Sequence, residues 1–176
     1  MLSEARTWQA LPLAALQPEL GPFEDWVLCG GHSVSLLTGR DERSHGDTDI
    51  GVLRSQLCEC LSVFHPSRVF LCLDGQHHPW DGVDVPDEVH DIWIASDDLE
   101  HWVLQIMVFD DEGDTVIYRR DPRIHWPLEN HFTVINGVRV LNPLVTFLFK
   151  ANQMKLADKD AQDLSAMIAR LKLESE

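Results

Sequence analysis

Apolar and polar residues follow each other along this chain with two different spacings, and these spacings predict an intermixed series of strands and helices. Short apolar runs bounded by Gly, Pro, Asp and Asn predict strands at residues 26–29, 47–54, 68–73, 90–95, 102–109, 115–118, 132–135 and 138–141. Apolar residues at helical spacing, or capping residues at the start of a segment, predict helices at residues 1–20, 32–38, 55–64, 142–156 and 158–171. This order of elements is typical of an α/β (α+β) protein with a small mixed β-sheet flanked by helices.

Turn-forming residues separate several of these elements. Asn136-Gly137 lies between two apolar runs and predicts a type I′ hairpin. Asp74-Gly75 predicts a second turn, and Gly39 is suited to end a helix. The segment 76–89 is rich in His, Pro, Asp and Gly, so we expect it to be a mobile loop.

The length of 176 residues predicts a single domain. We divide it into an N-terminal helix (about 1–20), a core (about 21–141) and C-terminal helices (about 142–176). No apolar stretch approaches the roughly 18 residues of a membrane span, so we expect no contact with a membrane. The four cysteines lie inside apolar runs, which is typical of reduced, buried thiols in a cytoplasmic protein.

The charge of the chain bears on its partners. The 14 basic and 29 acidic residues give a formal net charge of −15, and no Lys or Arg occurs between Arg68 and Arg119. Such a surface repels a nucleic-acid backbone and attracts a cationic small molecule. The alternative is that the acidic residues only maintain solubility.

The segment Gly30-Gly31-His32-Ser33 is suited to binding a phosphate chain. It follows the predicted strand at 26–29 and opens a predicted helix. Glycines allow backbone N–H groups to approach an anion closely, and the N-terminus of a helix adds a favourable dipole. The hydroxyl of Ser33 can donate a further hydrogen bond.

Two carboxylates follow at a spacing that suits metal binding. Asp47 and Asp49 lie two residues apart at the start of a predicted strand, so both side chains are expected on one face, roughly 6–7 Å apart along the strand. Such carboxylates suit two hard cations about 3.5–4 Å apart, the arrangement used in phosphoryl and nucleotidyl transfer.

These two features, in this order and thirteen residues apart, resemble the signature of the nucleotidyltransferase superfamily that includes DNA polymerase beta. The segment from Gly39 to Ile50, with Arg40, Arg43 and His45, is similar to aminoglycoside and lincosamide nucleotidyltransferases and their bacterial relatives. Three further segments also resemble that group: 118–122, 149–151 and 159–163.

The resemblance implies a nucleotidyltransferase fold and the Mg²⁺-dependent transfer of a nucleoside monophosphate from an NTP to a hydroxyl group. It implies that Asp47 and Asp49 hold two Mg²⁺ ions when the NTP is bound. The implied acceptor is a small molecule, and the acidic composition favours a cationic one similar to an aminoglycoside. Nucleotide-binding roles are implied for Gly30, Gly31, Ser33, Arg40, Arg43, Lys150 and Lys159.

The alternative for the basic residues is that none of them binds a ligand. Arg40 and Arg43 would then be surface charges on a turn, and Lys150 and Lys159 would be solvated helix residues. Arg119 and Arg120 have an equally plain alternative, a salt bridge to Asp121 or to the acidic loop.

The relatives also supply a third acidic residue from a neighbouring strand, as a metal ligand or as the base for the acceptor hydroxyl. The matching position is Gln105, which we assign to the catalytic group with Asp47 and Asp49. A glutamine can coordinate a cation but cannot accept a proton at neutral pH. Glu100 and Asp110 flank this strand an odd number of residues away, so they are expected to face its other side.

Other interpretations stay open. The chain is alternatively a catalytically impaired member that binds a nucleotide or a partner, or a toxin-type relative that modifies a protein. Residues 31–35 also mimic a hydrolase nucleophile elbow, which needs more strands before its serine. Zinc binding by His77, His78 and His90, or by the Cys58-x-Cys60 pair, lacks the usual ligand spacing.

Overall fold

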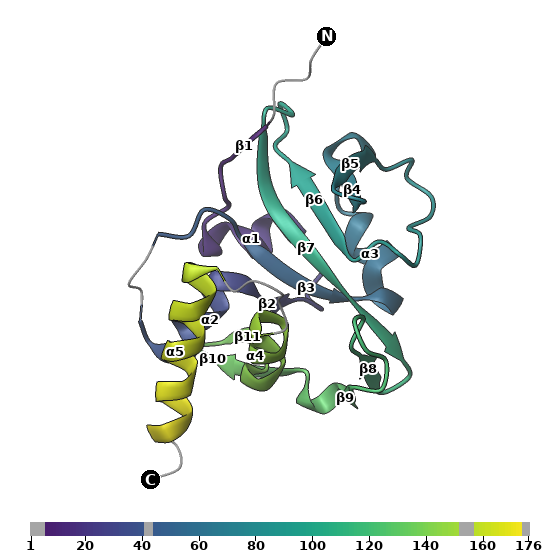
Figure 1. Ribbon diagram of the computed structural model, residues 1–176. Coiled ribbons are helices and arrows are strands. Elements are labelled where there is room, and N and C mark those ends of the chain that lie inside the picture. Colours follow the sequence, from purple (N-terminus) through teal and green to yellow (C-terminus); the bar gives the residue numbers. More distant parts are fainter. Residues whose placement is uncertain (1–5, 41–43, 152–156, 174–176) are drawn as a thin grey trace.

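A mixed β-sheet forms the centre of the protein in the computed structural model, which describes residues 6–40, 44–151 and 157–173 (Figure 1). Its strands are β1 (Thr7–Trp8), β2 (Val27–Leu28), β3 (Asp49–Leu53), β4 (Val69–Leu73), β5 (Gln76–Pro79), β6 (Asp91–Ala95), β7 (His101–Glu112), β8 (Thr115–Ile117), β9 (His125–Pro127), β10 (Phe132–Ile135) and β11 (Val138–Leu141). The helices are α1 (Leu13–Leu20), α2 (Gly30–Thr38), α3 (Leu57–Leu61), α4 (Pro143–Ala151) and α5 (Asp158–Leu173). The predicted α/β class with a mixed sheet is confirmed.

The long strand β7 organises the sheet. It pairs in parallel with β3 and antiparallel with β6, and the strand order across the sheet is β10-β11-β2-β3-β7-β6-β4-β5. At one end β7 also pairs with β1, and at the other end with β8. Because β2 pairs antiparallel with β3, the end of β2 and the start of β3 lie at the same edge of the sheet.

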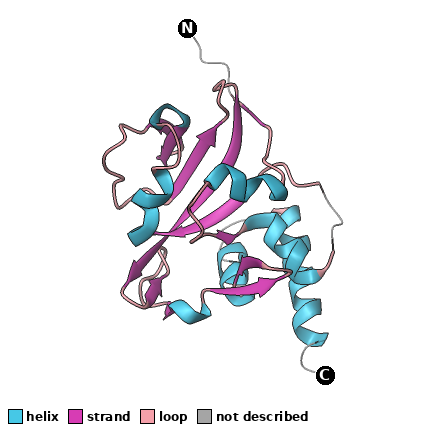
Figure 2. Ribbon diagram, turned by 180° about the vertical axis from the view of Figure 1, so that it is seen from behind, coloured by secondary structure: helices cyan, strands magenta, loops and turns pink. Residues whose placement is uncertain are grey.

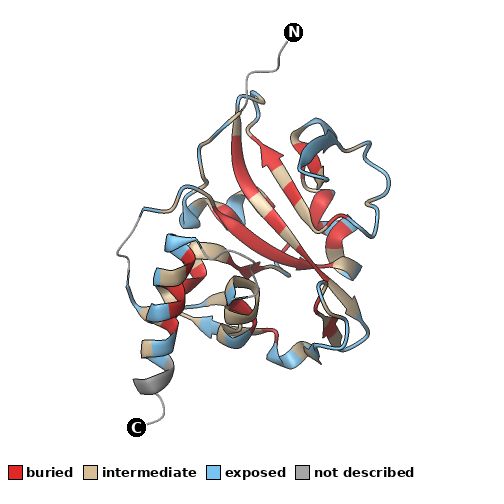
Figure 3. Ribbon diagram, in the orientation of Figure 1, coloured by how far each residue is buried: buried red, intermediate tan, exposed pale blue. Residues whose placement is uncertain are grey.

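One face of the sheet carries the main hydrophobic core. Along β6 and β7, buried and half-buried residues alternate, as Figure 3 shows. The buried set packs against α1 and α3, which cover the face seen in Figure 2, with contributions from α2. The helices supply Leu16, Leu20, Leu37, Leu57, Cys60 and Leu61 to this cluster. The continuous burial of these side chains is the main stabilising contribution to the fold.

The opposite face is covered only in part. A smaller cluster joins Val27, Cys29 and Phe109 of the sheet to Val145 and Phe149 of α4. The half-buried residues of β6 and β7 lie beyond this cluster, on the same face. The second face therefore leaves polar side chains of the central strands accessible.

The predicted turns are present. Asn136 and Gly137 have φ of 51° and 80°, and they join β10 to β11 as the hairpin signal predicted. Asp74 and Gly75, with φ of 52° and 73°, join β4 to β5 in the same way. Gly39 ends α2 in the left-handed conformation.

The N-terminal prediction is wrong in its first part. Residues 1–20 do not form one helix, because Thr7 and Trp8 pair in parallel with β7 and α1 begins only at Leu13. Pro12 holds extended backbone, with φ −65° and ψ 149°, directly before α1. Backbone pairing with an exposed edge of β7 thus prevails over the weak helical spacing.

Two further elements differ from the predictions. The segment 76–89 is not all loop, because β5 at its start pairs with β4. The helix predicted at 55–64 is shorter: a 3₁₀ turn at Arg54–Gln56 precedes α3. Ser55 does not cap it through its side chain; its backbone N–H instead donates to Oδ1 of Asp111. The strand β9 was not predicted, and the helix end predicted at 152–156 lies outside the described residues.

Within the described ranges, no helix is both long enough and apolar enough to cross a membrane. All four cysteines are free thiols. Cys29 and Cys60 are buried as predicted, Cys72 is partly exposed, and Cys58 is exposed because its side chain lies on the outer side of α3.

We expect Gly51→Ala to destabilise the protein. A Cβ at Gly51 would lie 2.5 Å from Cε2 of Phe109 and 2.9 Å from Cγ2 of Val27, so the second cluster would be overpacked. The expected loss is about 1–3 kcal/mol in the free energy of unfolding, measured by urea denaturation. Gly46→Ala is the matched control: a Cβ there meets nothing within 4 Å, and its expected effect is within about 0.5 kcal/mol. Equal stability of the two variants would contradict this packing.

Candidate active site

The glycine turn lies directly against a carboxylate. Cys29 extends β2, its backbone N–H donates to the carbonyl oxygen of Asp49 (2.9 Å), and α2 begins at Gly30. Gly30 has φ +63°, and a Cβ there would lie 1.8 Å from Oδ2 of Asp49. Only glycine allows this approach. The start of α2 at Gly30 therefore lies against the carboxylate of Asp49.

Ser33 has a different position from the one expected. It is fully buried in the first turn of α2, and its hydroxyl donates to the carbonyl oxygen of Gly30 (2.8 Å). This hydrogen bond occupies the hydroxyl inside the helix. The phosphate-binding potential of the turn thus lies in the backbone N–H groups at the start of α2.

Asp47 and Asp49 share one side of the chain where β3 begins. Thr48, between them, is buried and donates to the carbonyl oxygen of Leu11 on the opposite side (2.7 Å). Asp49 is only 9% exposed, and burial raises its pKa from 3.8 to about 7, with the charge of Asp47 acting in the same direction. A buried carboxylate beside a second, partly exposed one is a site that a cation stabilises.

Gln105 lies next to Asp49 on β7. The two residues are paired in the parallel register of β3 and β7, so their side chains share the partly open face. Gln105 is half-buried, and its Nε2 donates to Oδ1 of Asp91 (3.2 Å). The amide at the expected third-acid position is therefore bound to a carboxylate from the next strand.

Asp91 is the residue that sequence reasoning missed. It is the first residue of β6, half-buried, and its charge raises the pKa of Asp49 further. Nη1 of Arg119 lies 3.3 Å from Oδ2 of Asp91. A usable signal was present: like Asp49, Asp91 is an acidic residue at the very start of an apolar strand.

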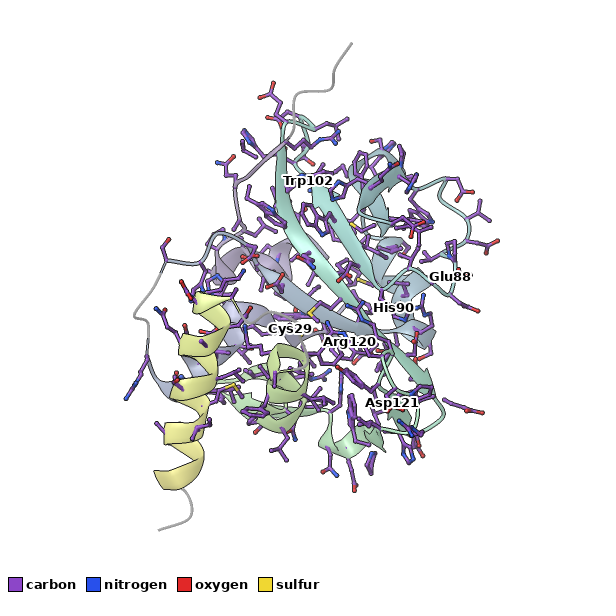
Figure 4. The ribbon with its side chains drawn as sticks, viewed as in Figure 1. Cys29, Glu88, His90, Trp102, Arg120 and Asp121 are labelled. Atoms are coloured by element: carbon purple, nitrogen blue, oxygen red, sulfur yellow. The ribbon has the colours of Figure 1, made fainter. Side chains whose placement is uncertain are left out.

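The two acidic residues near the ends of this strand, Asp110 within β7 and Glu100 just before it, do not join this group. Asp110 is held by Arg54 (2.8 Å) and by Nε2 of His90 (2.7 Å; His90 is labelled in Figure 4). Glu100 is exposed in the turn between β6 and β7. Asp110 lies five residues from Gln105 in the same strand, which agrees with the expectation that it faces the other side, whereas Glu100 lies in the turn before β7 and its bulge.

The basic residues divide into two groups. The positive charges of Lys150 and Lys159 lower the pKa of Asp49, against the larger effect of burial, so both act on the carboxylate site. Lys150 is mostly buried and pairs with the buried Asp160 (3.0 Å) and Asp163 (2.8 Å), which ties α4 to α5. Lys159 is exposed on α5.

Arg40 lies away from the glycine turn. It is exposed just beyond the C-terminal end of α2, about 13 Å along the helix from Gly30. Arg43 lies outside the described residues. Arg119 binds Asp91 rather than Asp121, and Asp121 instead pairs with Arg123 (2.7 Å). Nη1 of Arg120 donates to the carbonyl oxygen of Phe149 (3.4 Å) (Figure 4).

The carboxylates fit a divalent cation bound together with a phosphate ligand. In the described part of the chain, no three His, Cys, Asp or Glu side chains form a complete metal-binding group. Asp47 and Asp49 offer hard oxygen ligands and excess negative charge, and Mg²⁺ commonly combines one or two carboxylates with substrate phosphates. The residues present thus suit Mg²⁺ without forming a closed cage.

Asp49→Asn is expected to stabilise the metal-free protein at high pH. The pKa of Asp49 in the folded protein lies above its ordinary value, so the stability that its protonated form contributes is lost as the pH rises from about 4 through about 7. In EDTA, the gain in unfolding free energy should reach about 1–3 kcal/mol near pH 8 and vanish below about pH 4, where the carboxyl group is protonated in both the folded and the unfolded state. Thermal melts across this range measure it, with Asp114→Asn, an exposed carboxylate, as the control. A loss of stability that is equal at every pH would contradict the buried charge.

Comparison with solved structures finds the same fold in other proteins. The lincomycin-bound lincosamide antibiotic adenylyltransferase LnuA matches with a TM-score of 0.54 and 16% identity, over 82% of this chain and 86% of that chain. ANT(2″)-Ia in complex with adenylyl-2″-tobramycin matches with a TM-score of 0.52 and 14% identity, over 92% and 86%. The solution structure of the antibiotic-resistance factor ANT(2″)-Ia gives 0.53 and 16%, over 92% and 80%.

No protein-family profile matches the chain, and no relative is found among curated proteins. The identities of 14–16% establish the fold and no more. The resemblance that the glycine turn and the two aspartates implied is confirmed at this level: the protein has the nucleotidyltransferase fold.

Proposed function

We propose that the protein is a Mg²⁺-dependent nucleotidyltransferase that moves a nucleoside monophosphate from an NTP to a hydroxyl group of a small acceptor. The observation that carries this proposal is the contact between the start of α2 and Asp49. Backbone donors for a phosphate chain and a buried carboxylate for a cation lie side by side, because Gly30 has no Cβ. Nucleotidyl transfer needs both within a few ångströms of each other.

Different residues of the site bind the triphosphate and the Mg²⁺. Backbone N–H groups at Gly30 and Gly31 bind the triphosphate, and Lys159 adds positive charge from α5. Lys150 acts from α4, where its ion pairs with Asp160 and Asp163 hold it in place. Asp47 and Asp49 hold the Mg²⁺, which when bound neutralises the phosphate oxygens and polarises the phosphorus for attack.

Asp91 supplies the carboxylate that Gln105 lacks. The acceptor hydroxyl oxygen attacks the α-phosphorus, the bond from that phosphorus to the bridging oxygen breaks, and pyrophosphate leaves. The hydroxyl proton passes to the carboxylate of Asp91. Gln105 donates to Oδ1 of Asp91 and Arg119 lies at Oδ2, so both residues position this carboxylate on the same face as Asp49.

A small, positively charged acceptor fits the charge of the protein. The net charge of −15 and the long segment without Lys or Arg would attract a cation and repel nucleic acid. The solved proteins with this fold include one with lincomycin bound and one with adenylyl-2″-tobramycin, which supports a small acceptor here.

A nucleotide-binding module without catalysis is the second candidate. The observation that favours it is Gln105, an amide at the position where the fold's relatives have an acid, combined with Lys150 held by two internal carboxylates. Such a protein would bind the NTP without turning it over.

Mg²⁺ should strengthen NTP binding strongly. The double variant Asp47→Asn and Asp49→Asn should lose the Mg²⁺-dependent part of the affinity while the fold persists. Titration calorimetry with ATP, with Mg²⁺ and with EDTA, measures this difference, and a thermal melt checks the fold. Equal affinity in the two conditions for the native protein would contradict the metal site.

Asp91→Asn should slow transfer without weakening Mg²⁺–ATP binding. General-base assistance contributes about 10²–10⁴-fold, so a loss in this range is expected. Pyrophosphate release in the presence of a set of hydroxylated amines and glycosides measures the rate. Asp87→Asn, an exposed carboxylate on the preceding loop, is the matched control. Undiminished release by Asp91→Asn would remove this residue from the reaction, and no release by the native protein would favour the binding module.

A further inference from the structure

An aromatic hollow lies beside the carboxylate group on the partly open face of the sheet. It has a volume of about 560 Å³, in the range of small-molecule sites. We define the aromatic hollow by its lining residues: Arg6, Trp8, Phe70, Gln76, His77, Trp93 and Trp102. Phe70 and Trp102 are buried at 8% and 5% exposure and form its floor, whereas Trp8 and Trp93 are partly exposed.

An irregularity in strand pairing places Trp102 in the aromatic hollow. Ile94 pairs with Leu104 and Ala95 with Trp102, so Val103 is an extra residue in β7. Such a bulge changes which side chains face each side of the sheet. Val103 packs in the main core, and Trp102 lies on the other face, 5.3 Å from Trp93 between ring centroids. Figure 4 labels Trp102 at the upper end of β7.

The remaining rings come from separate strands. The parallel pairing of β1 with β7 brings Trp8 to Trp93, with centroids 4.9 Å apart. His77 of β5 lies 4.4 Å from the ring of Trp93. The guanidinium of Arg6 lies 4.4 Å above Phe70 and is held by the carbonyl oxygen of Leu99 (2.6 Å). Trp8 and Trp93 are the two partly exposed tryptophans of the hollow, and Trp93 also contacts Trp8, His77 and Trp102.

The aromatic hollow lies within reach of the carboxylates. Trp93 is paired with Gln105, and Gln105 with Asp49, so three neighbouring strands connect the two places. With strands about 4.8 Å apart, the Cα atoms of Trp93 and Asp49 are about 10 Å apart across the sheet. A ligand of moderate size can therefore contact Trp93 and still place a hydroxyl group beside Asp91.

The direction of the reaction decides which substrate lies there. In an in-line displacement, the attacking oxygen and the leaving pyrophosphate are on opposite sides of the α-phosphorus. The glycine turn and Lys150 lie with α2, α4 and α5 on the β2 side of β3 (Figure 1). The acceptor must then approach from the side of β7 and β6, where the aromatic hollow lies.

We infer that the aromatic hollow binds the ring of the acceptor, and that the acceptor carries a flat apolar ring face next to its hydroxyl group. This inference rests on the proposed function. Tryptophan faces stack on such rings, and a small number of polar groups then fixes orientation. Arg6 is the charged residue among the seven lining residues, and none of them is a carboxylate. The hollow therefore binds the ring of the acceptor and not its positive charge.

The test uses phenyl β-D-glucopyranoside, which combines a flat ring with hydroxyl groups. Indole N–H signals of the native protein are followed by ¹H–¹⁵N NMR and assigned with single Trp→Phe variants. The expected result is that the signals of Trp8, Trp93 and Trp102 shift while those of Trp26 and Trp126 do not. Trp93→Ala should weaken this binding about fivefold or more. Trp26→Ala, which changes a different hollow, should leave it unchanged.

Saturating Mg²⁺–ATP separates this inference from the proposed function. The phenyl glucoside should bind equally well with and without the nucleotide. Displacement of the glucoside by ATP would show that the aromatic hollow binds the nucleoside base, and it would overturn the inference. So would an absence of shifts, or shifts that glucose or tobramycin produces equally. A failure of the proposed function would give a different result, ATP binding that does not depend on Mg²⁺. The shifts of the indole N–H signals with the phenyl glucoside can still be interpreted in that case.

Discussion

The site depends on the close contact between Gly30 and Asp49. The antiparallel pairing of β2 with β3 brings the start of α2 onto the carboxylate, and a Cβ at Gly30 would overlap Oδ2 of Asp49. The same contact buries Asp49 beside Asp47, which raises its pKa to about 7. An ionised carboxylate in this position opposes folding unless a cation is nearby. The geometry that suits phosphate and metal binding thus has a cost in stability.

The destabilising carboxylate and the stabilising main core lie on opposite faces of the sheet. The apolar residues of β3, β6 and β7 that alternate with Asp49, Asp91 and Gln105 lie in the main core, packed against α1 and α3. Because side chains alternate along a strand, each strand contributes to both faces at once. The core can hold the strands in register while the other face keeps polar groups accessible. Strained or charged groups are tolerated where the surrounding structure holds them in place.

On the polar face, side chains from neighbouring strands form one group. Gln105 has the place beside Asp49, and the carboxylate comes from β6 through Asp91. Arg119, from the segment after β8, contacts that carboxylate as well. Three segments distant in sequence therefore converge on one oxygen-rich group. On the proposed function, the aromatic hollow, which includes Trp93, extends this face toward the acceptor.

Local signals in the sequence determined much of the fold. The hairpin at Asn136-Gly137, the turn at Asp74-Gly75 and the end of α2 at Gly39 follow from residues that accept positive φ. Local periodicity placed Asp47 and Asp49 on one side of the chain, whereas their closeness to the glycine turn followed only from the resemblance to the nucleotidyltransferase signature. The acidic composition favours a small cationic partner over a nucleic acid, and this stays a prediction.

Tertiary contacts decided the rest. Thr7 and Trp8 form a strand because β7 offers them an unpaired edge, which helical spacing in residues 1–20 does not reveal. The buried hydroxyl of Ser33 donates to the carbonyl oxygen of Gly30 in its own helix. Lys150 pairs with Asp160 and Asp163 because the packing of α4 against α5 brings these side chains together. Asp91 meets Gln105 only through the register of β6 and β7. Register is set by the packing of whole faces, so a single sequence does not specify which distant side chains share a site.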